Sequence, residues 1–137
     1  MGRPWDDVIS AEEIERYKAA GFGRPSGLGK RPALLIIDVQ YRTVGLERRP
    51  YWEAIKEFKT SCGEVGWSAI DHIVPLLKLF RERDYPVFYP YVAPKMGYDA
   101  GRLAQKVPDI MNISARGYDF PTEIAPRETD VMVPKKH

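Results

Sequence analysis

Two residues of opposite charge, Asp38 and Lys135, are the first candidates for chemistry because each follows a short apolar segment. Asp38 ends the run ALLII at residues 33–37, which is too short for a membrane span and fits a strand buried on both faces. Lys135 follows another strand-like segment, at residues 130–134, which is the third predicted strand along the chain. In open α/β sheets, ligands bind at the carboxyl ends of the strands, so Asp38 is a candidate for taking part in chemistry. The alternative is that Asp38 caps the turn that follows the strand. If the two strands are parallel neighbours, both charges meet in one crevice and stabilise each other there.

The elements that must position these charges are predicted by hydrophobic spacing. Residues 61–64 form an S-x-x-E capping box, and apolar residues then recur every three or four positions, which predicts an amphipathic helix ending near Arg83. Pro75 within it either bends the helix or lies where a backbone donor can be spared. Residues 87–92 predict the next strand. A strand, a helical crossover and a parallel strand form a βαβ unit, so we expect an α/β fold with a Rossmann-like parallel sheet.

The amino-terminal segment predicts an arm rather than part of the sheet. An S-x-x-E motif at residues 10–13 predicts a helix that stops near Gly21. The glycine-rich residues 21–29 precede a strand instead of following one, so we interpret them as a linker and not as a phosphate loop. We expect residues 1–30 to form a helical arm with its linker, and residues 31–137 to form the sheet domain.

Further short elements and long loops are predicted within the sheet domain. We expect a short helix at residues 51–58, another near residues 99–106, and an irregular stretch over residues 93–121 that serves as a lid or an oligomer contact. The loop after Asp38 carries Arg42, Arg48 and Arg49, which either bind an anionic substrate or face water.

Composition restricts the classes of function. A chain of 137 residues has room for one domain. Its net charge is +2, from 21 basic and 19 acidic residues without long runs of either sign, which gives no sign of nucleic-acid binding. No membrane segment or signal peptide is visible. Cys62 is the only cysteine, which excludes an internal disulfide and a CxxC metal site and favours a cytoplasmic setting.

Three motifs together resemble the isochorismatase-like cysteine hydrolases, and most closely their N-carbamoylsarcosine amidohydrolase-like branch. The motifs are RPALLIIDVQ at residues 31–40, TSCGEVGW at 60–67 and EIAPRETDVMVPK at 123–135, and the resemblance extends to the amino-terminal residues 5–10. It implies a parallel sheet with helices on both faces, and a catalytic set of Asp, Lys and Cys. It puts the Asp at Asp38 and the Lys at Lys135. Asp38 would take the proton of the thiol and pass it to the leaving amine, while Lys135 would stabilise the thiolate.

The sequence departs from this family at the nucleophile. The family's catalytic Cys lies well beyond its Lys, whereas this chain ends at His137. Cys62 aligns with a Cys of the helix-start motif, where it is best interpreted as a small apolar residue. We therefore expect a three-layer α/β/α sheet that is incomplete in this chain and completed by a second polypeptide carrying the Cys. Cleavage at the His137 boundary or a split gene would produce such a pair, and the family implies a tetramer of pairs.

The expected function is hydrolysis of an amide or carbamoyl C–N bond in a small molecule, without a cofactor. Related nicotinamidases hold a metal through an Asp and two His after the second strand, but this chain has no His between Val87 and Tyr118, so no metal is carried over. One alternative is a non-catalytic assembly subunit with the same half-fold. A more remote one is a phosphoacceptor receiver-like domain, although the paired acidic residues of its first strand are missing here.

Overall fold

The computed structural model describes residues 7–136, which divide into two units at Lys30. Helix α1 (Ala11–Ala19) forms the regular part of the first unit. The Ser10 side chain accepts a hydrogen bond from the Glu13 amide at 3.2 Å, as the capping motif predicts, and the helix ends before Gly21, whose φ is +84°. Residues 5 and 6 of the amino-terminal motif, and the boundary residue His137, lie outside the described residues.

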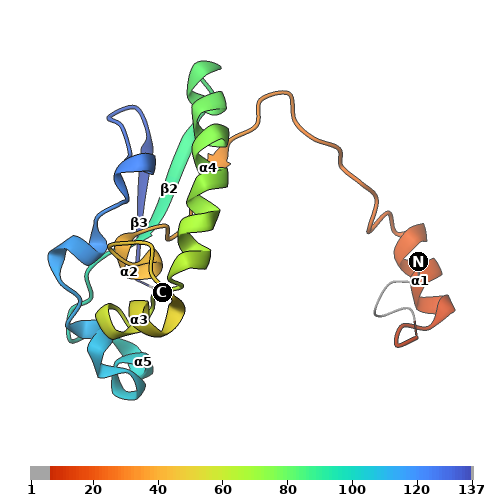
Figure 1. The fold of residues 1–137 in the computed structure, drawn as a ribbon. Coiled ribbons are helices and arrows are strands. Elements are labelled where there is room, and N and C mark those ends of the chain that lie inside the picture. The colour runs from red at the N-terminus through yellow and green to blue at the C-terminus, as the bar shows by residue number, and fades with distance from the viewer. Residues whose placement is uncertain (1–6, 137) are drawn as a thin grey trace. The chain divides into compact units, whose positions relative to one another are not determined.

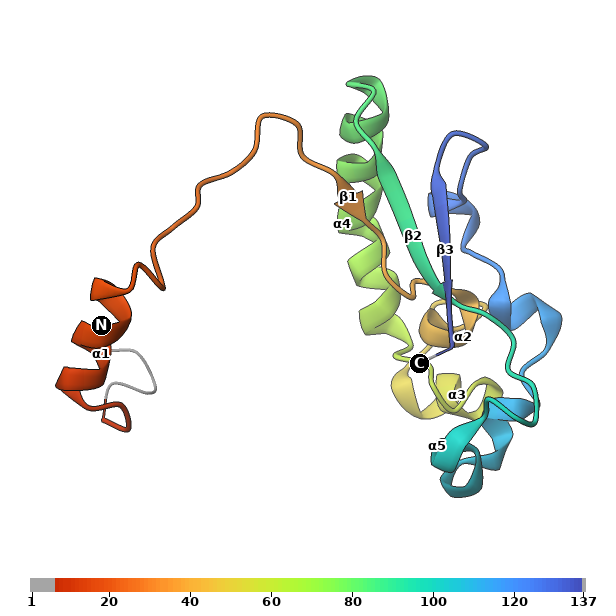
Figure 2. The same ribbon diagram turned by 180° about the vertical axis from the view of Figure 1, so that it is seen from behind.

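The second unit contains a parallel sheet of three strands in the order β1-β2-β3. The strands are β1 (Leu34–Leu35), β2 (Val87–Val92) and β3 (Val131–Lys135). Helix α4 (Glu64–Glu82) connects β1 to β2 and lies along one face of the sheet (Figures 1 and 2). The α/β class and the parallel sheet are confirmed. The expectation that the strands before Asp38 and Lys135 are neighbours is wrong, because β2 lies between them.

The core lies between α4 and one face of the sheet. From the helix, Ile70 and Leu77 are each only 2% exposed. They pack with buried residues from the sheet and its connections, namely Ile36, Val44, Val87, Tyr89 and Ile124. The predicted end of the helix is confirmed, with Arg83 as its C-cap. The capping box predicted at residues 61–64 is wrong: Gly63, at φ +60°, is the N-cap, and the Ser61 hydroxyl accepts a hydrogen bond from the Gly63 amide instead.

The opposite face of the sheet is uncovered in the described part of the chain. Directly opposed residues of paired strands point to the same face, which places Leu35 in a row with Phe88 and Val131. Leu35 and Ile37 are each 54% exposed, while Leu34 and Ile36 face α4. The described residues therefore form a sheet with one helical layer, and within them residues 33–37 are buried on the α4 face only.

Short helices gather at the end of the sheet where β2 and β3 finish (Figures 1 and 2). A helical turn, α2, is the next element after β1 and lies where the sequence predicts a loop. The helix predicted at residues 51–58 is present as α3, and the one predicted near residues 99–106 is present as α5. Their bounds, with those of the three 3₁₀ helices, are α2 Tyr41–Val44, α3 Tyr51–Glu57, α5 Gly101–Lys106, η1 Pro108–Met111, η2 Ala115–Tyr118 and η3 Thr122–Ile124. Among residues 7–136, no helix has both the length and the apolar character needed to cross a bilayer.

Candidate active site

Asp38 and Lys135 form an ion pair at the carboxyl end of the sheet. The Lys135 Nζ lies 2.7 Å from the Asp38 Oδ2, and the two side chains are 32% and 31% exposed. The structure thus brings together the two charges that the strand ends predict. Partial burial strengthens their attraction relative to a pair in bulk water, while one side of the pair stays accessible to a reactant.

The backbone at Asp38 is held in an uncommon conformation. Its φ is +59°, in the left-handed region that Asp tolerates better than most residues. Two hydrogen bonds fix it there: the Asp38 amide donates to the Pro90 carbonyl oxygen at 2.9 Å, and the Asp38 carbonyl oxygen accepts from the Gln40 amide at 2.9 Å. Strained backbone conformations of this kind are frequent at functional sites, which makes Asp38 a candidate for chemistry.

The carboxylate of Asp38 uses only one of its oxygens. Oδ2 binds Lys135, whereas Oδ1 is buried and accepts no hydrogen bond from any described residue. A buried carboxylate oxygen without a donor is costly, which makes Oδ1 a strong acceptor for a proton or a polar hydrogen brought to the site. The arrangement is suited to general acid–base chemistry.

Gln40 holds the carboxyl ends of the strands together, a role that the sequence alone does not show. Its side chain is completely buried. The amide nitrogen donates to the carbonyl oxygens of Tyr118 at 2.7 Å and Val92 at 3.2 Å, and the amide oxygen accepts from the Val92 amide at 3.0 Å. A polar residue two positions after Asp38 was the only signal in the sequence. Gln40 fixes the end of β2, over which Lys135 reaches to Asp38.

The three arginines that follow Asp38 have different environments. Arg48 and Arg49 form surface ion pairs with Asp71 at 2.6 Å and with Glu47 at 2.7 Å, so they face water. Arg42, on α2, is only 6% exposed. Its guanidinium carbon lies 5.2 Å from the centroid of the Tyr118 ring, within the range of a cation–π interaction. Arg42 is the arginine that the structure places inside the protein at this end of the sheet.

Cys62 does not join the pair. It is exposed in the connection between α3 and α4, where its amide donates to the Thr43 carbonyl oxygen at 2.7 Å. In the described part of the chain, no hydrogen bond links its side chain to Asp38 or Lys135. Residues 7–136 also contain no cluster of three or more His, Cys, Asp and Glu side chains suited to a metal ion.

Comparison with known proteins gives likenesses at the level of structure alone. No family model matches the sequence, and no curated protein matches it. Among solved structures, the chain is similar to a protein from Chromobacterium violaceum ATCC 12472 that is assigned, as a hydrolase, to the isochorismatase family. The identity is 20% and the TM-score is 0.46, with 82% of this chain and 48% of that chain covered. This chain therefore spans about half the length of that structure.

Proposed function

We propose that this chain is the amino-terminal portion of a cysteine hydrolase that cleaves an amide or carbamoyl C–N bond in a small molecule. Asp38 acts as its general base and then its general acid, and Lys135 stabilises the thiolate. The motifs at residues 31–40, 60–67 and 123–135 support the isochorismatase-like family and its N-carbamoylsarcosine amidohydrolase-like branch. The single observation that carries the proposal is the carboxylate of Asp38, held by Lys135 through Oδ2 while its buried Oδ1 lacks a donor.

The proposed reaction moves one proton through Asp38. A thiol brought next to Oδ1 gives its proton to the carboxylate, and the resulting thiolate attacks the carbonyl carbon of the substrate. The tetrahedral intermediate then expels the amine, which takes the proton from Asp38, and a thioester remains. Water then loses a proton to the same carboxylate and attacks the thioester; the thiolate is expelled and takes that proton back, which restores the thiol and the carboxylate. Acid–base catalysis of this kind contributes about 10²- to 10⁴-fold in rate.

Lys135 has two roles in this scheme. Its ammonium, 2.7 Å from Oδ2, orients the carboxylate so that Oδ1 is left for the thiol. It also places a positive charge beside the position where the thiolate forms, which favours the charged nucleophile.

We further propose that a second polypeptide supplies the nucleophilic Cys and the missing helical layer, and that several such pairs associate, as a tetramer. The uncovered face of the sheet supports this proposal: Leu35, Ile37, Val131 and Val133 are between 41% and 54% exposed. Sheets of this class bury both faces, and their open edges are paired or covered. A partner that covers this face would convert the sheet into the three-layer α/β/α arrangement.

The test of the activity is a screen of the purified assembly for ammonia release from carbamoyl and amide compounds. We expect Asp38→Asn, which suits the same backbone conformation, to lower kcat/KM by about 10²-fold or more. Asp84→Asn is the matched control, because Asp84 is an exposed aspartate that also has a positive φ, of +51°. Equal activity of the two variants would refute the role of Asp38. One equivalent of zinc in the active assembly would count against a metal-free reaction.

The test of the second chain is the intact mass of the active material. We expect this chain together with a companion polypeptide that contains a reactive Cys. Active material consisting of a single 15.7 kDa species would refute the split arrangement.

The exposed apolar face also supports a second function, that of a non-catalytic assembly subunit. In that case, the complete assembly releases no ammonia from any compound of the screen, and Asp38→Asn changes neither assembly nor turnover. The Asp38 variant therefore separates the two functions.

A further inference from the structure

A concave region lies at the same end of the sheet as the ion pair, between α2 and α5. It has a volume of about 490 Å³ and lies next to the ion pair in the fold, because Val92 lines it and is the β2 partner of Lys135, while Lys136 directly follows Lys135. This volume falls within the usual range for small-molecule sites, which is about 300–1,000 Å³. Adjacent strands lie about 5 Å apart, so the Val92 side of the pocket lies one strand spacing from Lys135.

Arg42 is the most unusual residue of this pocket. It is 6% exposed, and its Nη1 is buried without a hydrogen-bond partner among the described residues. No carboxylate in the described part of the chain forms an ion pair with it. Arginine cannot shed its charge, and the Tyr118 ring compensates only part of the cost of burying it. A buried, unpaired guanidinium points to an anionic group that enters the pocket.

The other charged residues that line the pocket are also positive. Lys95, Arg102 and Lys136 join Arg42, and none of the described residues that line the pocket is acidic. Asp99 lies nearby and binds the Lys136 Nζ at 2.9 Å, which accounts for one of the four positive charges. Among residues 7–136, the Lys95 ammonium donates a hydrogen bond to the carbonyl oxygen of Lys136, a neutral group, and forms no ion pair. The pocket therefore keeps an excess of positive charge.

The pocket is also lined by apolar side chains. The apolar part of the lining consists of Val92, Ala100, Leu103 and Ile110. Ile110 and Ala100 are buried, whereas Leu103 is 54% exposed at the rim. A ligand that fits this surface carries an anionic group at one end and an apolar body at the other.

We propose that this pocket binds the carboxylate of a small substrate with an aliphatic body, and that Arg42 is the residue that selects the carboxylate. This inference rests on the proposed function for the identity of the ligand as a substrate, but it names a contact outside the Asp38–Lys135 pair. The enzyme would then prefer amides or carbamoyl compounds that carry a carboxylate over those that are neutral.

Binding is tested with the full chain and with its assembly, by calorimetric titration with hexanoate, hexanamide and acetate. We expect hexanoate to bind at least about tenfold more tightly than hexanamide, which lacks the charge, and than acetate, which lacks the apolar body. Arg42→Met lowers the affinity for hexanoate about tenfold or more, whereas Arg83→Met, which removes an exposed charge at the C-cap of α4, changes it less than twofold. Hexanamide binding as tightly as hexanoate, or no binding of hexanoate, would overturn the proposal.

A second pair of variants avoids disturbing a buried residue. Leu103 is half exposed, so Leu103→Glu and Leu103→Gln both leave the fold intact and differ only by one negative charge in the pocket. We expect the Glu variant to bind hexanoate at least about fivefold more weakly than the Gln variant, because its carboxylate competes for the same cations. Equal affinities would contradict the electrostatic argument.

These measurements are independent of catalysis by Asp38. If the proposed function fails, Asp38→Asn leaves turnover unchanged, while the preference for hexanoate over hexanamide persists. If the inference fails, the ligands bind without regard to charge, while Asp38→Asn still abolishes hydrolysis.

Discussion

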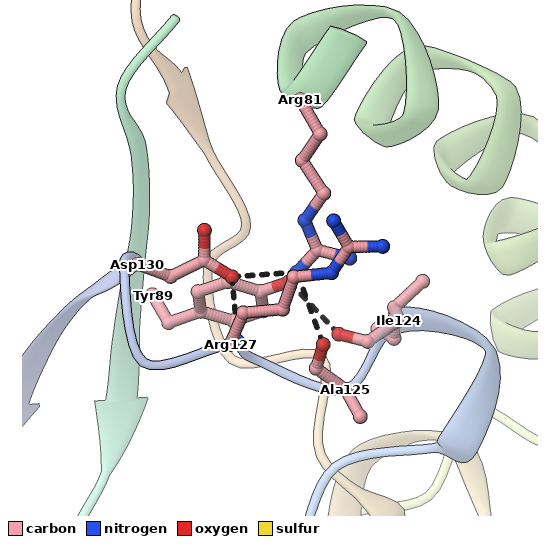
Figure 3. A network of polar contacts seen from close by, with 6 residues as sticks. All are labelled: Arg81, Tyr89, Ile124, Ala125, Arg127 and Asp130. Atoms are coloured by element: carbon pink, nitrogen blue, oxygen red, sulfur yellow. Dashed lines mark hydrogen bonds and ion pairs between the residues drawn. The ribbon is translucent and has the colours of Figure 1, made fainter. Parts of the chain in front are cut away.

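The start of β3 is anchored by a buried ion pair, and its removal should loosen the strand that carries Lys135. Figure 3 shows Arg81, from α4, directed at Asp130, which directly precedes β3. The Arg81 Nη2 lies 2.5 Å from the Asp130 Oδ2, and the side chains are only 15% and 4% exposed. The same guanidinium donates to the Ala125 carbonyl oxygen at 3.0 Å, and the same carboxylate accepts from the Arg127 amide at 2.8 Å.

The substitution Asp130→Ala leaves a buried guanidinium without its counter-charge. Breaking a buried pair from one side costs about 3–5 kcal/mol, because the remaining charge stays desolvated. The lost hydrogen bond from the Arg127 amide adds about 1 kcal/mol. Domains are stable by only about 5–15 kcal/mol, so we expect Asp130→Ala to remove a large part of the free energy of unfolding.

Urea unfolding of the purified protein measures this loss. The control is Glu82→Ala, which removes a carboxylate that lies 3.7 Å from the Lys78 ammonium on the exposed side of α4. That exposed pair contributes less than about 1 kcal/mol. Amide hydrogen exchange at Val131–Lys135 should also accelerate in the Asp130 variant and not in the control. If the two variants lose the same stability, the buried pair does not anchor β3.

Three other changes have defined outcomes. Burial raises the pKa of Tyr89 from 10.0 to about 12, so this tyrosine ionises at lower pH in the unfolded chain than in the folded one. The free energy of unfolding therefore falls by about 1–3 kcal/mol as the pH rises between these two values. Alkaline denaturation should show this fall in the parent protein and not in Tyr89→Phe. Gly63→Ala should cost about 1–3 kcal/mol in thermal unfolding, because φ is +60° and an added Cβ would lie 2.7 Å from the Arg49 carbonyl oxygen. Lys135→Met keeps the apolar stem but removes the ammonium from Asp38, so kcat/KM for ammonia release by the assembly should fall about 10- to 100-fold.

The elements that periodicity controls could be predicted from the sequence. Strand β2 has the bounds that its apolar residues indicate, and α4 ends where its repeat of threes and fours ends. The start of α4 could not be predicted, because two local patterns compete there. Ser61 has the form of a capping residue, but the Cys62 amide is bonded to Thr43, so the helix begins two residues later, after Gly63. A motif of four residues does not contain that tertiary contact.

The burial of the polar residues of the site could not be predicted from sequence patterns, for a related reason. Gln40 bonds to Val92 and Tyr118, which are 52 and 78 residues away along the chain. Arg42 stacks on the same Tyr118. Nothing in the local sequence distinguishes Arg42 from Arg48, although one is buried and the other is on the surface. Only the folded arrangement of α2 and η2 separates them.

The Asp38–Lys135 contact could be predicted because parallel strands end at one edge of the sheet, but the strand order adds a requirement. With β2 between them, β1 and β3 are separated by two strand spacings, about 10 Å, which only a long side chain can bridge. The Lys135 ammonium must therefore lean over the end of β2 to reach within 2.7 Å of Asp38. A shift of β3 by one residue would turn Lys135 to the other face of the sheet. We expect the Asp130 anchor to oppose that shift, so that the ion pair at one end of β3 supports the ion pair at the other end.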